Sequence, residues 1–202
     1  VLLRGAPEVT YDYVEDVSEE SYAPFIGKAD GLVIRTQPLS AGTVAGADRL
    51  KIVSRHGVGY DAVDVAALNA RRIPLCVVGD VNSISVAEHA MMLILACARA
   101  LIRADRSVRN GSWGWRNKLE ASDIAGKRLL VLGYGRAGRR LAGLAQSFEM
   151  EIRAYDPFLM HGDWPAGPAT PVASLADGLS WADVVSVNVP KGDTPLLGAE
   201  EF

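Results

Sequence analysis

Three glycines in the stretch GYGRAG have the spacing of a phosphate-binding loop. Gly133, Gly135 and Gly138 follow the apolar run Arg128–Leu132 and precede a helical pattern. In a strand-loop-helix unit the first glycine permits a tight turn, the second lets the backbone approach a pyrophosphate, and the third lets helix and strand pack closely. The helix N-terminus offers free N–H groups and a partial positive charge to the phosphates. The stretch therefore predicts a dinucleotide-binding loop.

An aspartate follows at the distance that such a loop needs. Asp156 directly follows the predicted strand Glu151–Tyr155 and lies 18 residues beyond Gly138. A carboxylate there accepts hydrogen bonds from an adenosine ribose and repels a 2′-phosphate, which favours NAD over NADP. We also expect Arg136 and Ala137 to contact the cofactor, although Arg136 could instead be solvated. The alternative is that the glycines form an ordinary tight turn and the aspartate only begins a turn before a proline.

A second glycine pair, Gly57-Val58-Gly59, also follows an apolar run but lacks the third glycine. Asp61 and Asp64 come directly after it, and two carboxylates are poor neighbours for a phosphate. A carboxylate ligand fits this loop better, because two or three backbone N–H groups can bind it without a helix running straight out of the loop. A plain tight turn remains the alternative.

Apolar runs alternate with helical patterns along the chain, which predicts an α/β fold with parallel sheets. The predicted strands are Val9–Val14, Gly31–Arg35, Lys51–Ser54, Ile73–Val78, Arg128–Leu132, Glu151–Tyr155 and Asp183–Val189. The predicted helices are Ser18–Ile26, Ala41–Ala47, Val63–Ala70 and Arg139–Phe148.

One helical pattern, Ser83–Val108, runs on without a breaker and is longer than the usual helix of about 11–12 residues. A polar and aromatic stretch with two tryptophans, RNGSWGWRNKLEASDIAG, follows it and indicates a loop or arm. This change in composition predicts one α/β lobe over residues 1–82, a connecting helix and arm over 83–120, and a second α/β lobe over 121–202.

Composition excludes several classes of protein. Hydrophobic content of 49% and charged content of 22% are typical of a globular protein, and a net charge of −3 argues against nucleic acid or an anionic membrane as partner. The apolar run Ala90–Ala98 is too short to span a membrane and predicts a buried helix. Cys76 and Cys97 lie in apolar runs, so we expect buried, reduced thiols, a cytoplasmic protein and no metal site.

Both ends of the sequence resemble cut ends. The chain begins with Val1, carries no signal-peptide pattern, and stops inside a helix-like stretch, LLGAEEF. We therefore expect a piece of a longer protein, with the second lobe incomplete.

Taken in order, three patterns resemble one known family. G-x-G-x-D-x-x-D begins at Gly57, N-x-x-S-V-A-E begins at Asn82, and the dinucleotide loop with YDP follows the WGWR arm. Over roughly residues 27–190 the chain resembles the D-isomer-specific 2-hydroxyacid dehydrogenases. That resemblance implies two Rossmann-like or flavodoxin-like parallel-sheet lobes joined by a long helix. It also implies interconversion of a D-2-hydroxy acid and its 2-keto acid, with hydride passing to or from NAD.

The resemblance implies roles for individual residues. The backbone at Val58 and Gly59 would hold the substrate carboxylate, Asn82 would touch the substrate and Val86 would lie against the nicotinamide. The long helix and its tryptophan arm would form a homodimer, although an ordinary buried helix with packed tryptophans is the alternative. Arg35 and Arg55 match arginines of phosphoglycerate dehydrogenases and could bind an anionic substrate tail, or could be solvated.

The chain departs from the family after the fourth strand of the cofactor lobe, where the motif differs and the following segment, KGDTPLLG, is shorter than usual. The family has His-x-Pro after the fourth strand of the cofactor lobe, where this chain has Asn188-Val189-Pro190. Only Pro190 is therefore carried over as a cofactor contact. The residues that would match the family's catalytic arginine, acid and histidine are expected beyond residue 202, so we expect residues 1–202 to be inactive alone. The three histidines present, His56, His89 and His161, are expected to be structural or solvated.

Two other functions fit the same scaffold. The first is an NAD-binding regulatory protein such as a redox-sensing corepressor, which the downstream sequence would distinguish from an enzyme. The second is a dehydrogenase of the alanine dehydrogenase type, which the N-x-x-S-V-A-E stretch disfavours. Which hydroxy acid the protein uses does not follow from the sequence.

Overall fold

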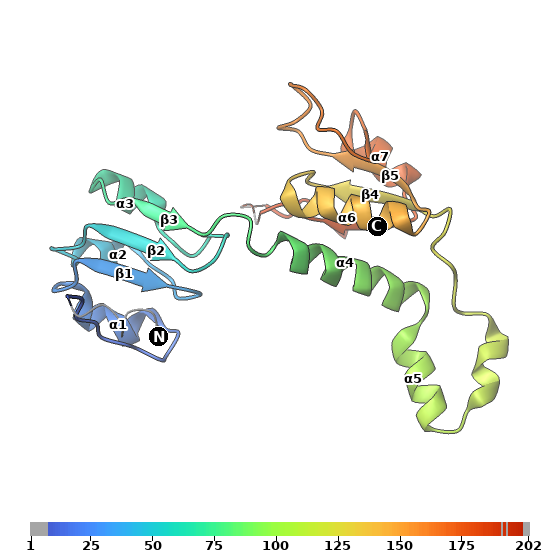
Figure 1. Ribbon diagram of the computed structural model, residues 1–202, viewed down its shortest axis with the longest axis horizontal. Helices are drawn as coiled ribbons and strands as arrows, with labels where there is room; N and C mark the ends of the chain where they lie inside the picture. Colours follow the sequence, from blue (N-terminus) through green and yellow to red (C-terminus); the bar gives the residue numbers. More distant parts are fainter. Residues whose placement is uncertain (1–7, 191, 193, 200–202) are drawn as a thin grey trace. The chain divides into compact units, whose positions relative to one another are not determined.

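A computed structural model of the chain describes residues 8–190, 192 and 194–199 (Figure 1). The chain divides into two compact units, Val1–Val81 and Asn82–Phe202. No single helix in the described part is long and apolar enough to cross a membrane; a pair of helices, Ser83–Ala98 and Leu101–Arg109, passes that test jointly but is bent by 60°.

The first unit is a three-stranded parallel sheet with short helices (Figure 1). Its elements are α1 (Glu19–Ile26), β1 (Gly31–Ile34), α2 (Ala41–Ala45), β2 (Ile52–Arg55), α3 (Val65–Ala70) and β3 (Leu75–Val77). The strand order is β1-β2-β3. Buried aliphatic side chains, among them Leu39, Val53 and Leu68, form one core between sheet and helices. Because the strands are parallel, their carboxyl ends share one edge, which is where open α/β sheets bind ligands.

The strand predicted at Val9–Val14 is wrong: these residues form no strand. Tyr13 is 81% exposed, and Val9 and Tyr11 are exposed as well. Alternating apolar and polar residues make a strand possible, but a strand also needs a partner to bond. In the described part of the first unit, the sheet contains β1, β2 and β3 only.

The second unit is a four-stranded parallel sheet of order β6-β5-β4-β7. Its elements are α4 (Ser83–Ala98), α5 (Leu101–Arg109), the 3-10 helix η2 (Trp113–Lys118), β4 (Arg128–Leu132), α6 (Arg136–Ser147), β5 (Glu151–Tyr155), β6 (Thr170–Pro171), α7 (Leu175–Trp181) and β7 (Val184–Val187). Leu129 and Val131 of β4 pack in one core with α4 and α6, whereas Leu130 and Leu132 pack in another with α7. The central strand is therefore buried on both faces, as its unbroken apolar sequence requires.

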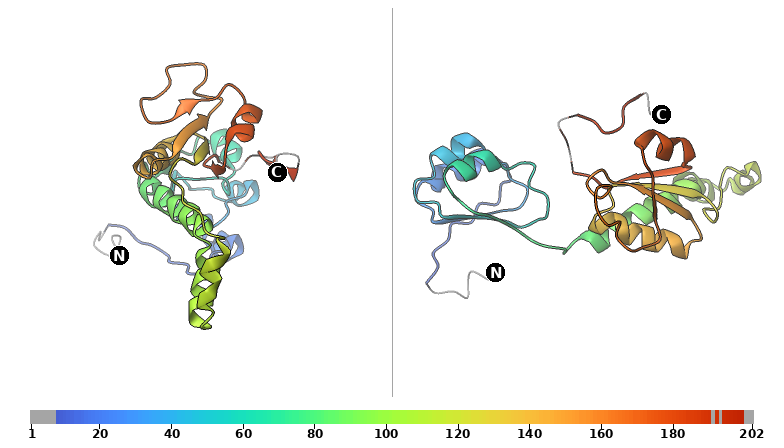
Figure 2. Two further views of the ribbon diagram at one scale, coloured as in Figure 1. Left: turned by 90° about the vertical axis from the view of Figure 1, so that its right-hand side faces the viewer. Right: turned by 90° about the horizontal axis from the view of Figure 1, so that it is seen from above.

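The single long helix predicted over Ser83–Val108 is also wrong. Ala100 adopts a left-handed conformation between α4 and α5, and the two helices meet at 60°. The N–H of Ser122 donates to the Ala98 carbonyl at 2.8 Å, where a continuing helix would place an N–H of its own. Helix α4 lies along α6, while α5 turns away and packs against η2 as an arm, defined here as residues 101–118 (Figures 1 and 2).

Smaller differences have local causes. Helix α6 begins at Arg136, three residues before its predicted start, because the glycine loop leads directly into it. Helix α7 and the two-residue strand β6 were not predicted from the sequence. Cys76 and Cys97 are free thiols but are exposed rather than buried; Cys76 lies on β3, which is an edge strand among the described residues.

Asp183 joins the starts of the two strands that border the cofactor loop. Its carboxylate accepts hydrogen bonds from the Arg128 backbone N–H at 2.9 Å and from the Arg128 guanidinium at 3.0 and 3.1 Å. The Asp183 N–H donates in return to the Arg128 carbonyl at 2.9 Å. These bonds to the Arg128 side chain and backbone hold the pKa of Asp183 well below its ordinary value of 3.8. The hydrogen bonds between Asp183 and Arg128 therefore hold β4 and β7 side by side at their amino ends.

We predict that Asp183→Asn lowers thermal stability in a pH-dependent manner. A depressed folded-state pKa means that the stabilisation is complete above the unfolded value of about 3.8 and disappears as pH falls through the lower folded value. Thermal unfolding followed by circular dichroism should show a constant gap between wild type and variant near neutral pH, shrinking below about pH 4. Asp123→Asn, which removes an exposed ion pair with Arg99, is the control. A gap that does not change with pH would contradict this account.

Candidate functional site

Two of the three loop glycines are required by the fold itself. Gly133 has a φ of +87°, and a Cβ there would lie 2.9 Å from the Asn188 carbonyl oxygen. A Cβ at Gly138 would lie 2.1 Å from the Gly133 carbonyl oxygen. Real Cβ atoms do not approach backbone so closely, so α6 can cross the end of β4 only with glycine at position 138, and the turn can pass the Asn188 carbonyl only with glycine at position 133. The predicted tight turn and close packing are confirmed.

Gly135 has a different surrounding. It is the N-cap of α6, it is exposed, and no atom lies within 4 Å of where its Cβ would be. The space outside this residue faces the first turn of α6, where Arg136 and Ala137 present the helix N-terminus. An anion in that space would meet unpaired N–H groups and the positive end of the helix dipole. The loop therefore fits a pyrophosphate by shape and by charge.

Asp156 lies at the end of β5, directly beside this loop. One carboxylate oxygen accepts a hydrogen bond from the Tyr134 N–H at 2.9 Å, and the other accepts from the Phe158 N–H at 3.1 Å. Each carboxylate oxygen has a second lone pair, so the group can still accept from two ligand hydroxyls. The backbone bonds fix the carboxylate next to the glycine loop, where the ribose of a dinucleotide would lie.

The aromatic residue inside the glycine motif, Tyr134, is a site residue that sequence reasoning missed. Its side chain is fully buried and stacks on Trp164, with ring centroids 5.0 Å apart and planes 5° from parallel. Trp164 donates its indole N–H to the Ala169 carbonyl at 3.1 Å. The stack thus attaches the segment after Asp156 to the cofactor loop. The sequence signal that could have found it is a large aromatic residue between the two glycines Gly133 and Gly135.

Sheet order determines where the other half of a dinucleotide would lie. Strand β4 pairs with β5 on one side and with β7 on the other. If Asp156 holds the adenosine on the β5 side, the nicotinamide half crosses the carboxyl end of β4, where the strand order of the sheet reverses direction, to the β7 side. A groove of ≈ 750 Å³ lies there, between α4 and β7. Its lining residues are Asn82, Ser85, Val86, His89, Ala90, Leu93, Ile94, Val185, Ser186, Val187 and Asn188.

The groove brings together two residues that the resemblance singled out, Asn82 and Val86. Val86 is 41% exposed, and the exposed Asn82 side chain makes no capping bond to α4, which leaves its amide available. Asn188, which stands where the family has histidine, donates its amide to the Ser186 carbonyl at 3.2 Å and hydroxyl at 3.1 Å. Pro190 is exposed two residues further on. The roles expected for these residues stay predictions.

The glycine pair of the first unit lies at the carboxyl end of β2. The Gly57 N–H donates to the Arg55 carbonyl at 2.8 Å, and its carbonyl accepts from the Val78 N–H at 3.2 Å. Among the described residues, no hydrogen bond uses the N–H of Val58 or Gly59. Gly59 does not have a positive φ, and its Cβ would make only an ordinary 3.5 Å contact with Asp61. The fold of this unit therefore tolerates a larger residue at Gly59.

Two arginines end neighbouring strands at the same edge. Arg35 follows β1 and Arg55 ends β2, where it pairs with Ile34. The Arg55 guanidinium lies over Gly57, so close that a Cβ on that glycine would be 2.3 Å from it, and it donates to the His56 carbonyl at 3.1 Å. A cation and two unused N–H groups thus share one edge of the first sheet, an arrangement that suits an anionic ligand.

The histidines lie apart from one another along the chain. The His56 N–H donates to the Ile34 carbonyl, His89 lines the groove beside α4, and His161 is exposed in the segment after Asp156. No group of three metal-ligating side chains occurs within the part of the chain that the structure describes.

The chain is similar to known dehydrogenases over most of its length. It is 35% identical to D-3-phosphoglycerate dehydrogenase of Archaeoglobus fulgidus over 189 residues, which is 92% of this chain and 36% of that protein. It is 36% identical to D-3-phosphoglycerate dehydrogenase of Mycobacterium tuberculosis, over 91% of this chain and 35% of that protein. The chain thus spans about a third of the length of these curated relatives.

Among solved structures, the NAD complex of NAD-dependent formate dehydrogenase from Staphylococcus aureus is similar in fold, with a TM-score of 0.76 and 26% identity over 85% of this chain and 52% of that one. Residues 91–202 match the family described as D-isomer specific 2-hydroxyacid dehydrogenase, NAD binding domain. That match covers the glycine loop, Asp156 and β7, whose geometry is that of a dinucleotide site. The chain belongs to the D-isomer-specific 2-hydroxyacid dehydrogenase family, and its second unit is the NAD-binding domain.

Proposed function

We propose that the protein containing this chain is an NAD-dependent oxidoreductase that interconverts a D-2-hydroxy acid and its 2-keto acid by hydride transfer. The observation that carries the proposal is the groove between α4 and β7, which adjoins the glycine loop on the side opposite Asp156. A dinucleotide bound with its adenosine at Asp156 would bring its nicotinamide into that groove. The bound nicotinamide would donate or accept the hydride.

The residues of the groove have two tasks in this proposal. Val86 presents an apolar surface against one face of the nicotinamide, which leaves the other face for substrate. The Asn82 amide, free of capping bonds, lies at the mouth of the groove and can bind a substrate oxygen. The general acid or base is not assigned to a residue of this chain, and His89 lines the groove without a bonded carboxylate among the described residues.

The substrate carboxylate is assigned to the loop of the first unit. The unused N–H groups of Val58 and Gly59 are the donors that a carboxylate needs, and Arg55 adds a positive charge beside them. Arg35, at the end of the neighbouring strand, could bind a second anionic group. Two arginines at one edge favour a substrate with a charged tail, such as a phosphoglycerate-like acid, over a hydroxypyruvate or glyoxylate reductase substrate.

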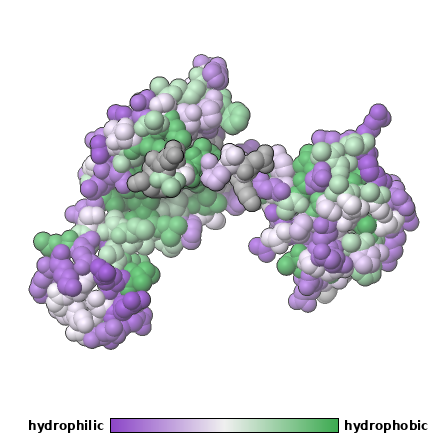
Figure 3. All heavy atoms as spheres, turned by 180° about the vertical axis from the view of Figure 1, so that it is seen from behind, coloured by the Kyte–Doolittle hydropathy of each residue, from purple (hydrophilic) through white to green (hydrophobic). Residues whose placement is uncertain are grey.

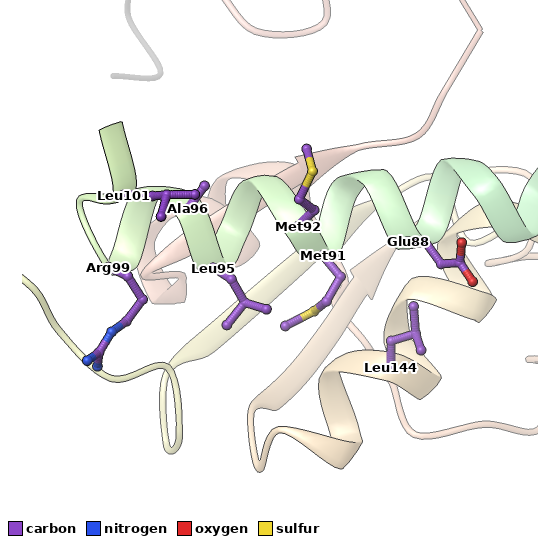
Figure 4. Close-up of a pocket in the computed structure, with 8 residues that line it drawn as sticks. All are labelled: Glu88, Met91, Met92, Leu95, Ala96, Arg99, Leu101 and Leu144. Carbon is purple, nitrogen blue, oxygen red and sulfur yellow. The ribbon is translucent and has the colours of Figure 1, made fainter. Parts of the chain in front are cut away.

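We also propose a homodimer formed through α4 and the arm. An apolar groove of ≈ 450 Å³ runs along α4 next to the start of α5 (Figure 4). Its lining residues are Glu88, Met91, Met92, Leu95, Ala96, Arg99, Leu101 and Leu144. On the arm, Ile102 is 73% and Trp113 61% exposed. From behind, hydrophobic atoms cover part of the second unit where it leads into the arm (Figure 3).

A second copy of the chain suits this surface because the surface is apolar at its centre and continues onto the arm, which extends away from the domain.

The free, exposed Cys76 and Cys97 favour a reducing compartment, and we propose the cytoplasm.

The proposed activity is tested by following NADH formation with matched D- and L-2-hydroxy acids, with and without a phosphate group, using the full-length gene product. Turnover of a D-acid alone supports the enzyme. NAD binding with no turnover of any acid in the panel would contradict it and favour an NAD-binding regulatory protein.

The first prediction from the proposed function concerns cofactor choice. Asp156→Ala should weaken NAD binding by about 10- to 100-fold, because it removes hydrogen bonds to a charged acceptor. Calorimetric titration of NAD and NADP into wild type and variant measures this. Asp163→Ala removes the same charge from the same segment and should leave NAD affinity close to wild type. Tighter binding of NADP than NAD by the wild type would refute the assignment.

The second prediction concerns the carboxylate loop. Gly59→Val should raise the substrate KM of the full-length protein at least tenfold, because the side chain would occupy the space that the carboxylate needs. NAD affinity and melting temperature should stay near wild type, since the structure leaves room for the side chain. Gly31→Val, at the opposite end of the same sheet, is the matched control and should change neither KM nor affinity. Loss of NAD affinity together with KM would show damage to the fold instead.

The third prediction concerns assembly. Met92→Glu should convert the dimer to a monomer, because a carboxylate would be buried in an apolar contact without a partner. Sedimentation velocity measures the change. Phe158→Glu alters a side chain that is 92% exposed in the segment after Asp156 and should leave the dimer intact. A wild-type chain that sediments as a monomer at high concentration would rule out this interface.

A further inference from the structure

A buried hydroxyl connects the start of α4 to α6. Ser83, the first residue of α4, is only 5% exposed. Its Oγ accepts a hydrogen bond of 2.7 Å from the Nε of Arg140, which lies in the second turn of α6. A charged donor makes this bond stronger than one between neutral groups. The bond joins the first turn of α4, beside the groove, to the helix whose N-terminus faces the glycine loop.

Helix α4 begins without a side-chain cap. Its N-cap, Asn82, makes no side-chain hydrogen bond to the helix, so the usual stabilisation of a helix start is absent. Further along, Ala87 and Met91 are buried in the core shared with α6. The bond to Ser83 therefore extends the contact between the two helices to the very start of α4.

This bond also fixes the direction of the groove residues. Successive residues of an α-helix are rotated by about 100°, so Val86 lies some 60° around the helix from Ser83. With Ser83 held against α6, the turn cannot rotate, and Val86 and Asn82 stay directed toward the groove. If the turn frays, these two residues are the first to move.

We infer that Arg140 is a positioning residue, which acts through Ser83 to hold Val86 and Asn82 against the nicotinamide half of the cofactor. The inference rests on the proposed placement of the nicotinamide in the groove between α4 and β7. One hydrogen bond would then couple the helix that receives the pyrophosphate to the turn that receives the ring. Arg140 need not touch the ligand to affect how it binds.

The test compares a ligand that has the nicotinamide with one that lacks it. NADH and ADP-ribose are titrated calorimetrically into the wild-type chain, Arg140→Met, Ser83→Ala and the double variant. Each single variant should weaken NADH binding by about tenfold and ADP-ribose binding by less than about twofold. The double variant should be no worse than Arg140→Met alone, because Arg140→Met already removes the bond to Ser83. Arg140→Lys, which keeps a donor, should recover part of the loss.

A spectroscopic readout reports on the ring itself. Fluorescence of bound NADH should be enhanced in the wild type, where the ring lies in an apolar groove, and most of that enhancement should disappear in Arg140→Met. Arg139→Met is the matched control: it removes the same charge from the preceding residue of α6, whose Nε donates to the Gly135 carbonyl. It should change NADH and ADP-ribose affinity by the same factor.

The outcomes separate this inference from the proposed function. Equal losses of NADH and ADP-ribose in Arg140→Met would overturn the positioning role and leave the cofactor site standing, as would a double variant with additive losses. Unchanged fluorescence of NADH on binding to the wild type would show that the ring does not enter the groove, and would overturn both. Melting temperatures within a few degrees of wild type exclude general unfolding as the cause.

Discussion

The close crossing of α6 over the end of β4 is the constraint from which the cofactor site follows. At Gly138 the helix comes so near the Gly133 carbonyl that no side chain fits between them. That crossing aims the N-terminus of α6 at the loop, places Gly135 at an open surface, and sets Asp156 within bonding distance of the Tyr134 N–H. Shape and charge for a pyrophosphate thus arise from one packing contact, and Gly138 cannot be replaced without moving the helix.

Helix α4 serves the same site from the other side. It packs along α6 as far as Ala98, where the Ser122 N–H takes the carbonyl that the next turn would use. Ala100 then adopts a left-handed conformation, which costs an alanine about 1 kcal/mol or more. The bend separates two tasks along one stretch of sequence: α4 covers the cofactor domain, and α5 with η2 extends away from it with apolar side chains exposed (Figure 2).

Local patterns predicted the elements, and tertiary contacts explain where those predictions failed. Both strands of the cofactor motif were predicted to the residue, because β4 is a short apolar run and both β4 and β5 are followed directly by a residue of the motif, Gly133 or Asp156. The break at Ala100 has no glycine or proline to mark it and depends on Ser122, which is remote in sequence. The strand expected at Val9–Val14 has the right alternation but no partner strand among the described residues. Likewise, the groove between α4 and β7 and the bond from Arg140 to Ser83 join segments about 57 to 100 residues apart, which no local pattern reports.

The division between the two units gives the start of α4 a further importance. The chain passes from one unit to the other at Val81–Asn82, so the N-cap of α4 is at once the end of the covalent link and part of the groove. A change in the first turn of α4 therefore acts on the link directly, without passing through the core. A turn that is bonded to the cofactor helix and directly follows the link to the first unit can therefore transmit a change at the link to the groove.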